Sequence, residues 1–179
     1  MYDQLTSLGR PYFHVWSGTS SGFCDAVWSL GRELGDRFVV RVLQGTRMRV
    51  VDEVFHECAA ALQFPYYFGN NWAALDECLV DLEWLPGTGY ILALAEANTI
   101  LCDGRDSLPT FLRILDRAGM FWPSEPNSQF AEARERVPTP FHVIFHAQKS
   151  ESAHLERMLS ALGYAVDDVS PCGVDGEAV

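Results

Sequence analysis

One long stretch of the sequence lacks positive charge. Between residues 50 and 104 there is no lysine or arginine, although the same stretch contains nine acids. The formal net charge is −11, and the remainder of the chain is nearly balanced, with 15 acids against 13 bases. Nucleic acids and anionic membranes attract basic proteins, so we expect neither as a partner. Acids gathered without counter-charges repel one another, which favours a basic partner over an ordinary solubilising surface.

Long apolar runs, export signals and paired cysteines are also missing. No uncharged apolar run approaches the ~20 residues that a membrane span requires. Residues 1–4 lack the basic segment of a secretory signal, so we expect a cytoplasmic protein. The cysteines form no Cys-x-x-Cys pair, so we expect buried free thiols, no metal site and no cofactor. They are Cys24, Cys58, Cys78, Cys102 and Cys172.

Strand-like and helix-like segments alternate along the chain. Hydrophobic residues make up 48% of the 179 residues, which suffices for one packed domain. Runs of β-branched and aromatic residues predict strands at 11–16, 37–43, 90–95 and 141–146. Apolar residues at helical spacing predict helices at 22–34, 50–62, 71–83, from 107 onward, and at 152–162. Residues 119–138 are predicted to be an irregular or partly helical insertion, and the last ten residues a tail. This alternation is typical of an α/β domain with a mainly parallel sheet.

The predicted helix 71–83 and the loop before it carry most of the functional information. On a helical wheel at ~100° per residue, one side is apolar and faces the core: Trp72, Leu75, Cys78, Leu79 and Leu82. The opposite side mixes acids with small or apolar residues: Ala73, Asp76, Glu77 and Val80, flanked by Asp81 and Glu83. Tyr66, Tyr67 and Phe68 cannot all point inward from a short loop. Exposed aromatic rings beside uncompensated acids are typical of a protein-binding face.

Residues 64–79, FPYYFGNNWAALDECL, resemble the signature of the barstar family, intracellular inhibitors of barnase-like ribonucleases. The similarity extends back through residues 42–45 and forward through the strands predicted at 90–95 and 141–146. The resemblance implies a barstar-like α/β core at 37–147, with a mainly parallel sheet of three to four strands packed with helices. A β-α unit at 1–36 is then an N-terminal addition, and residues 148–179 form a C-terminal helix and tail.

In this family the second helix and the preceding loop block the active site of the ribonuclease. The resemblance thus implies a non-enzymatic inhibitor of a basic, extracellular-type ribonuclease, monomeric when free. Carboxylates can pair with the cationic groups that hold RNA phosphate. The partner-binding residues carried over are Tyr67, Phe68, Gly69, Asn71, Ala73, Asp76, Glu77, Val80 and Asp81, with Glu77 at the central acid. Ala73 stands where barstar has aspartate and Asp76 where it has tryptophan, which leaves the choice of ribonuclease open.

An enzyme is the main competing interpretation, and the residues give it little support. Asp76 and Glu77 point ~100° apart on a helix, a poor arrangement for an acid and a base. His142 and His146 are roughly 13 Å apart along one strand, too far for one metal, so buried or edge histidines are expected. Cys78 lies in a negative field, which raises a thiol pKa. A second alternative keeps the fold: an acidic module that binds another basic protein in a regulatory role.

Overall fold

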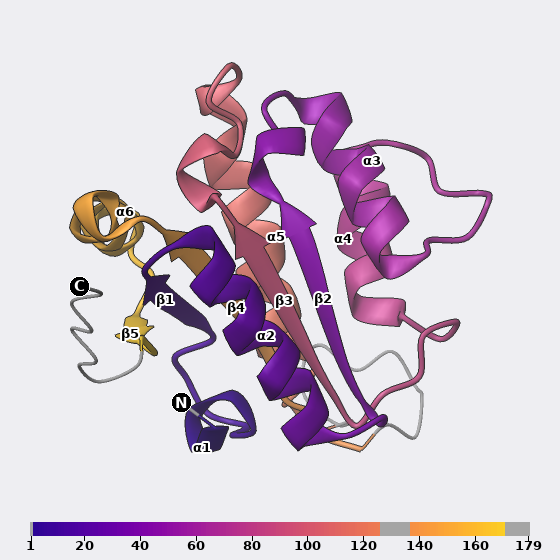
Figure 1. Ribbon diagram of the computed structural model, residues 1–179. Coiled ribbons are helices and arrows are strands. Elements are labelled where there is room, and N and C mark those ends of the chain that lie inside the picture. The colour runs from indigo at the N-terminus through magenta and orange to yellow at the C-terminus, as the bar shows by residue number, and fades with distance from the viewer. Residues whose placement is uncertain (1, 126–136, 171–179) are drawn as a thin grey trace.

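The protein is an α/β structure built on one parallel sheet (Figure 1). The computed structural model describes residues 2–125 and 137–170. Five strands pair in the order β2-β3-β4-β1-β5, all of them in parallel. They are β1 (Phe13–Ser17), β2 (Phe38–Gln44), β3 (Gly89–Ala95), β4 (Phe141–Ala147) and β5 (Val166–Asp168). The predicted α/β class with a parallel sheet is confirmed, and the four predicted strands begin and end within two residues of the observed ones.

Helices precede, connect and separate the strands along the chain. They are α1 (Tyr2–Leu5), α2 (Ser20–Leu34), α3 (Val51–Leu62), α4 (Trp72–Asp81), α5 (Leu108–Phe121) and α6 (Lys149–Ala161). The last five correspond to the predicted helices, whereas α1 and β5 were not predicted because elements of four and three residues show no periodicity. Residues 119–121 of the predicted insertion, expected to be irregular or partly helical, are the end of α5. Residues 126–136 of the insertion, and the predicted tail from 171 on, lie outside the described residues.

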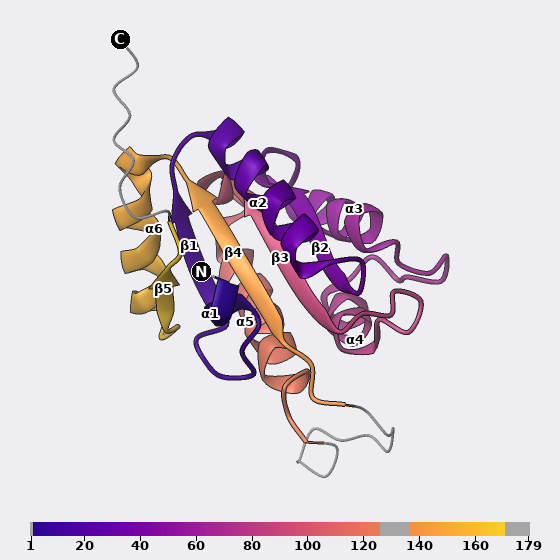
Figure 2. The same cartoon turned by 60° about the horizontal axis from the view of Figure 1, so that its bottom comes forward.

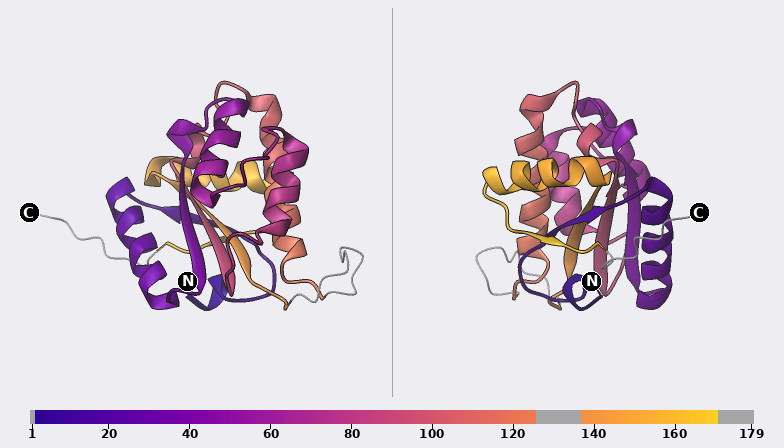
Figure 3. Two further views of the ribbon diagram at one scale, coloured as in Figure 1. Left: turned by 90° about the vertical axis from the view of Figure 1, so that its right-hand side faces the viewer. Right: turned by 60° about the vertical axis from the view of Figure 1, so that its left-hand side comes forward.

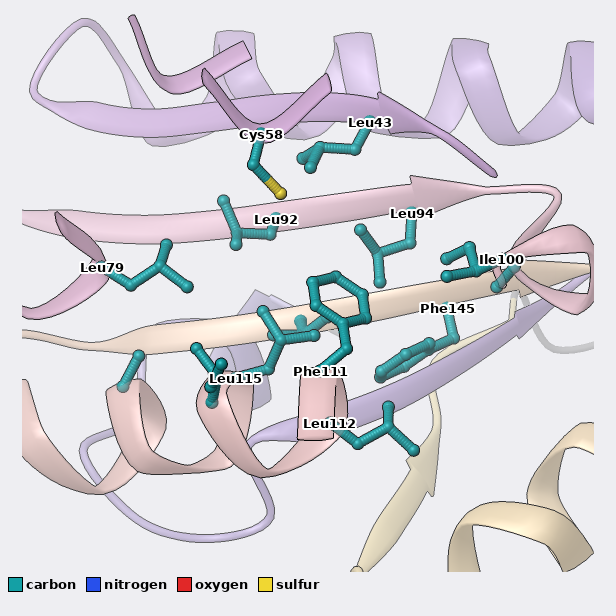
Figure 4. Packing of buried hydrophobic residues seen from close by; sticks show 14 of the residues in the cluster. Leu43, Cys58, Leu79, Leu92, Leu94, Ile100, Phe111, Leu112, Leu115 and Phe145 are labelled. Atoms are coloured by element: carbon teal, nitrogen blue, oxygen red, sulfur yellow. The ribbon is translucent and has the colours of Figure 1, made fainter. Parts of the chain in front are cut away.

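The sheet separates two apolar layers, because successive side chains of a strand point to opposite faces. On one face α3, α4, α5 and α6 pack against residues such as Leu92 and Phe145 (Figure 4). On the other face α2 packs against Trp16 and Ile144, together with Leu5 from α1. Figure 3 shows α2 on one side of the sheet and α4 with α5 on the other. Figure 2 shows α6 beside β1 and β5, the two strands that extend the sheet beyond β4.

Two helices, α3 and α4, occupy the connection between β2 and β3. Gln63 ends α3 in a left-handed conformation (φ 53°), and its backbone N–H donates to the carbonyl of Ala59. Asn71 begins α4, since its Oδ1 accepts a hydrogen bond of 2.9 Å from the N–H of Ala74. The Asn71 side-chain amide also donates to the carbonyl of Gly69 at 3.0 Å. These contacts fix the loop 63–71 and the entry into α4, which is the segment predicted to bind a partner.

Candidate protein-binding site

The aromatic loop before α4 exposes two of its three consecutive rings. Tyr66 is fully exposed and Tyr67 is 66% exposed, with the two rings edge-to-face at 5.6 Å between centroids. Phe68 turns inward and packs against Phe64 and Phe55, at 4.8 and 6.3 Å between centroids. The expectation that at least one ring is exposed is confirmed. Phe68, however, anchors the loop to the core and offers little surface to a partner.

The outer side of α4 is polar and partly small. Leu75, Cys78 and Leu79 are buried, and Trp72 packs edge-on against Phe55 at 4.9 Å, so the predicted core side is confirmed. The other predicted contact residues divide by exposure. Gly69, Asn71, Ala73 and Glu77 are exposed, whereas Asp76, Val80 and Asp81 are half-buried.

Glu77 is the carboxylate that lies open at the centre of this side of α4. It makes neither a hydrogen bond nor an ion pair with any residue in 2–125 or 137–170. Its position therefore fits the role that the resemblance assigns to it, a negative group free to meet a partner's cation.

Asp76 is half-buried, so the expectation of an exposed carboxylate at this position is wrong. Its Oδ2 accepts from Nη1 of Arg117 at 2.6 Å, and its Oδ1 is buried without a partner. Asp76 faces α5 because it lies one helical turn after Trp72. The Trp72 ring already contacts this helix, with its centroid 6.4 Å from that of Phe111. A helical wheel drawn for one buried side misses the second neighbour, α5. Arg117 was not predicted as part of the site, since nothing in its own surroundings in the sequence points to α4.

The acids of residues 50–104 do not form one continuous unneutralised ridge. Asp103 forms an ion pair with Arg49 at 2.9 Å, which lowers the pKa of that carboxyl through the hydrogen bond. Other carboxylates accept hydrogen bonds, Glu53 from the backbone of residues 49 and 50, Glu57 from that of Gln44, and Glu96 from the Ser20 hydroxyl. With Asp76, at least five of the nine acids have a partner. Arg117 and Arg49 neutralise Asp76 and Asp103, whereas the three hydrogen-bonded glutamates keep their charge but have an oxygen occupied within the fold.

The remaining candidate catalytic groups are engaged in structure. Burial, and after it the charges of Asp81 and Glu77, raises the pKa of the Cys78 thiol to about 11. His146 accepts from the backbone N–H of Glu96 through Nδ1 (3.1 Å), and its Nε2 donates to the carbonyl of Gly18 (3.2 Å). His142 and His146 are fully buried, as expected. Within residues 2–125 and 137–170, no three His, Cys, Asp or Glu side chains lie close enough together to hold a metal ion.

The expected burial of the thiols is correct only in part. Cys58 and Cys78 are buried, but Cys24 on α2 is exposed and Cys102 is half-buried. Cys172 lies outside the described residues. Cys24 directly follows the inward-facing Phe23 on α2 and lies ~100° around the helix from it, on the exposed side.

The part of the chain that matches a known protein family includes this site. A model of the family described as barstar (barnase inhibitor) matches residues 38–146. The chain belongs to the barstar family. The matched residues run from β2 to β4 and include the aromatic loop and α4, whereas β1, α2, α6 and β5 lie outside them. Members of this family are inhibitors rather than enzymes, which is family-level support for a non-catalytic role.

Other comparisons add little about function. No curated protein matches the chain. A similar solved structure is that of Drosophila ORC bound to AT-rich DNA and Cdc6, with a TM-score of 0.44 and 14% identity, covering 90% of this chain. This chain spans 50% of that one, and similarity at this level says nothing about function here. Among the described residues, no helix combines the length and the apolar character needed to span a membrane.

Proposed function

We propose that this barstar-family chain inhibits a basic, barnase-like ribonuclease by inserting α4 and the loop before it into the active-site cleft. The observation that carries the proposal is that the segment matched by the family contains two exposed tyrosines and the exposed carboxylate of Glu77, which has no ion pair within residues 2–125 and 137–170. An inhibitor of this kind acts in the cytoplasm, as a monomer, on an enzyme that would otherwise cleave cellular RNA.

The chemistry of the face suits a cleft that binds RNA phosphate. The Glu77 carboxylate is able to accept charge-assisted hydrogen bonds from the arginine or lysine side chains that hold phosphate. Ala73, one turn before it, is exposed and small, so it leaves room for a long cationic side chain. Tyr66 and Tyr67 supply large, rigid contact area, which is typical of residues that dominate binding energy in protein interfaces.

Charge also favours rapid association. The chain has a net charge of −11, and opposite fields accelerate the encounter of two proteins to about 10⁸–10⁹ M⁻¹s⁻¹ at low salt. A cell exposed to an active ribonuclease benefits from fast capture. We therefore expect the association rate constant to fall steeply as salt concentration rises, because salt screens interactions between exposed charges.

An RNA-cleavage assay tests the proposal with barnase as the enzyme. We expect cleavage to decrease in proportion to added chain and to be abolished near equimolar concentrations. Full cleavage in the presence of a large excess of folded chain would contradict the proposed inhibition of barnase-like enzymes. Tight binding to a different basic protein under the same conditions would instead favour the regulatory module.

A further inference from the structure

The α4 and α5 helices pack side by side along a seam of three contacts. At one end the Trp72 and Phe111 rings lie 6.4 Å apart, and at the other the Trp122 indole N–H donates to the Leu79 carbonyl at 2.8 Å. The ion pair of Asp76 and Arg117 lies between them. Both helices advance in the same direction along the seam. Asp76 is thus fixed to α5 from both sides by packed aromatic residues.

The Asp76 carboxylate is committed to this seam. Its side chain is 23% exposed against 37% for Arg117, and the two charged groups are 2.6 Å apart. The second carboxylate oxygen, Oδ1, is buried without a hydrogen-bond partner. A partly desolvated carboxylate needs its cation, and rotating Asp76 outward would leave Arg117 unpaired against the protein surface. The ion pair and the burial of Oδ1 both favour the α5 side for this carboxylate.

Glu77 differs from Asp76 in every one of these respects. It is exposed, it has no ion pair within residues 2–125 and 137–170, and it points ~100° away from Asp76 around the helix. The two adjacent acids therefore have separate roles. One is bound internally, and the other is open to solvent.

We propose that Arg117 is a positioning residue of the partner-binding face. It holds the Asp76 carboxylate against α5, so that Glu77 alone of these two acids meets the cations of the partner. The proposal rests on the proposed function and specifies which carboxylate of α4 faces the positive charge of the partner. The matching cleft centres its positive charge opposite Glu77, on the side of the helix that carries Ala73, and not opposite Asp76.

Removal of Arg117 separates a positioning role from a merely structural one. In Arg117→Met the seam loses its ion pair, so we expect a lower free energy of unfolding. The same change releases the Asp76 carboxylate and removes a cation from the acidic face, so we expect faster association with barnase at low salt, by about threefold to tenfold. A purely structural contribution would lower stability and slow binding together. Arg117→Lys keeps the charge beside Asp76 and should restore a rate near that of the wild type.

Three further variants of the full chain complete the test with barnase as the probe. Glu77→Gln should weaken binding by about thirtyfold or more, as expected for a central hot spot, whereas Asp76→Asn should change affinity by less than about threefold. The double variant Asp76→Asn, Arg117→Met should lose the faster association, because no carboxylate is left to release and the net charge returns to −11. Equal losses for Asp76→Asn and Glu77→Gln, or slower association of Arg117→Met, would overturn the proposal.

A failure of the proposed function gives a different result. If the wild-type chain does not bind barnase, the inhibitor proposal fails for this enzyme. The interaction between Asp76 and Arg117 is then tested without any partner. Unfolding experiments compare Asp76→Asn, Arg117→Met and the double variant. Non-additive losses support the assignment of Asp76 to the seam, and strictly additive losses contradict it.

Discussion

At the scale of single residues, neighbouring positions on α4 differ sharply in chemistry. Glu77 is exposed, and Cys78, the next residue, is buried with a pKa raised to about 11, by burial first and then by the charges of Asp81 and Glu77. A thiol reacts as the thiolate, so the same negative charge that suits a cationic partner keeps this cysteine unreactive. Burial likewise raises the pKa of Cys58.

Thiol labelling tests this description of the cysteines. At pH 8 in the folded chain, we expect a maleimide reagent to modify the exposed Cys24 rapidly and Cys58 and Cys78 slowly, as read by peptide mass spectrometry. Glu77→Gln removes one of the charges beside Cys78, so its labelling should begin at a slightly lower pH than in the wild type. Rapid modification of Cys78 in the folded wild-type chain would show that α4 is not packed as described.

At the scale of elements, the sequence predicted one side of α4 well and the other less well. Leu75 and Leu79 recur at helical spacing and are buried, because the sheet imposes one dominant apolar side. Asp76 was misplaced because its neighbour, Arg117, comes from α5, and no local pattern encodes which helices pack together. The exposed position of Glu77 was predicted correctly, because it lies on the side of α4 opposite the buried Leu75 and Leu79.

The start of α4 provides a prediction for the element as a whole. Asn71→Ala removes the side-chain oxygen that accepts from the N–H of Ala74, so we expect a loss of about 1 kcal/mol in the free energy of unfolding. Asn71→Ser retains a capping oxygen and should lose much less. Urea denaturation of the three chains measures the difference. Equal stability of wild type and Asn71→Ala would mean that the cap does not hold the helix.

At the scale of the whole molecule, β1 joins the family-matched part of the chain through β4. The four long strands were foreseeable from composition, but their order was not, because pairing depends on contacts between distant segments. The division into an added unit at 1–36, a core at 37–147 and a C-terminal part at 148–179 stays a prediction.

The structure adds a buried polar contact between β1 and β4, in which His14 lies against His142.

The protonation of this histidine pair follows from its partners. The Nε2 of His142 is 2.9 Å from the Ser7 carbonyl oxygen, which only accepts, so Nε2 carries a proton. The Nδ1 of neutral His142 then accepts from Nε2 of His14 at 3.0 Å, which leaves Nδ1 of His14 buried without a partner. Burial, together with His142, lowers the pKa of His14 to about 3, and burial lowers the pKa of His142. Both rings are therefore neutral in the folded chain at neutral pH.

Acid should destabilise the protein through this pair. Histidines of the unfolded chain bind protons near pH 6.5, whereas His14 in the folded chain does not until about pH 3. The free energy of unfolding should therefore be unaffected above about 6.5 and fall below it, by at most about 1.4 kcal/mol per pH unit for each histidine. His14→Gln keeps an N–H donor without titrating, so its stability should depend less on pH. Identical slopes for both chains, measured by urea denaturation between pH 5 and 8, would contradict this.

The central claim is that the exposed Glu77 of α4 meets a cationic cleft, and a pair of charge reversals tests it most directly. Glu77→Lys and Asp25→Lys change the net charge equally, but Asp25 is exposed on α2, on the opposite face of the sheet. Titration calorimetry with barnase should show a loss of at least ~2 kcal/mol for Glu77→Lys and little change for Asp25→Lys, with unfolding temperatures near that of the wild type. Equal losses for the two variants, or undiminished binding by Glu77→Lys, would contradict the account.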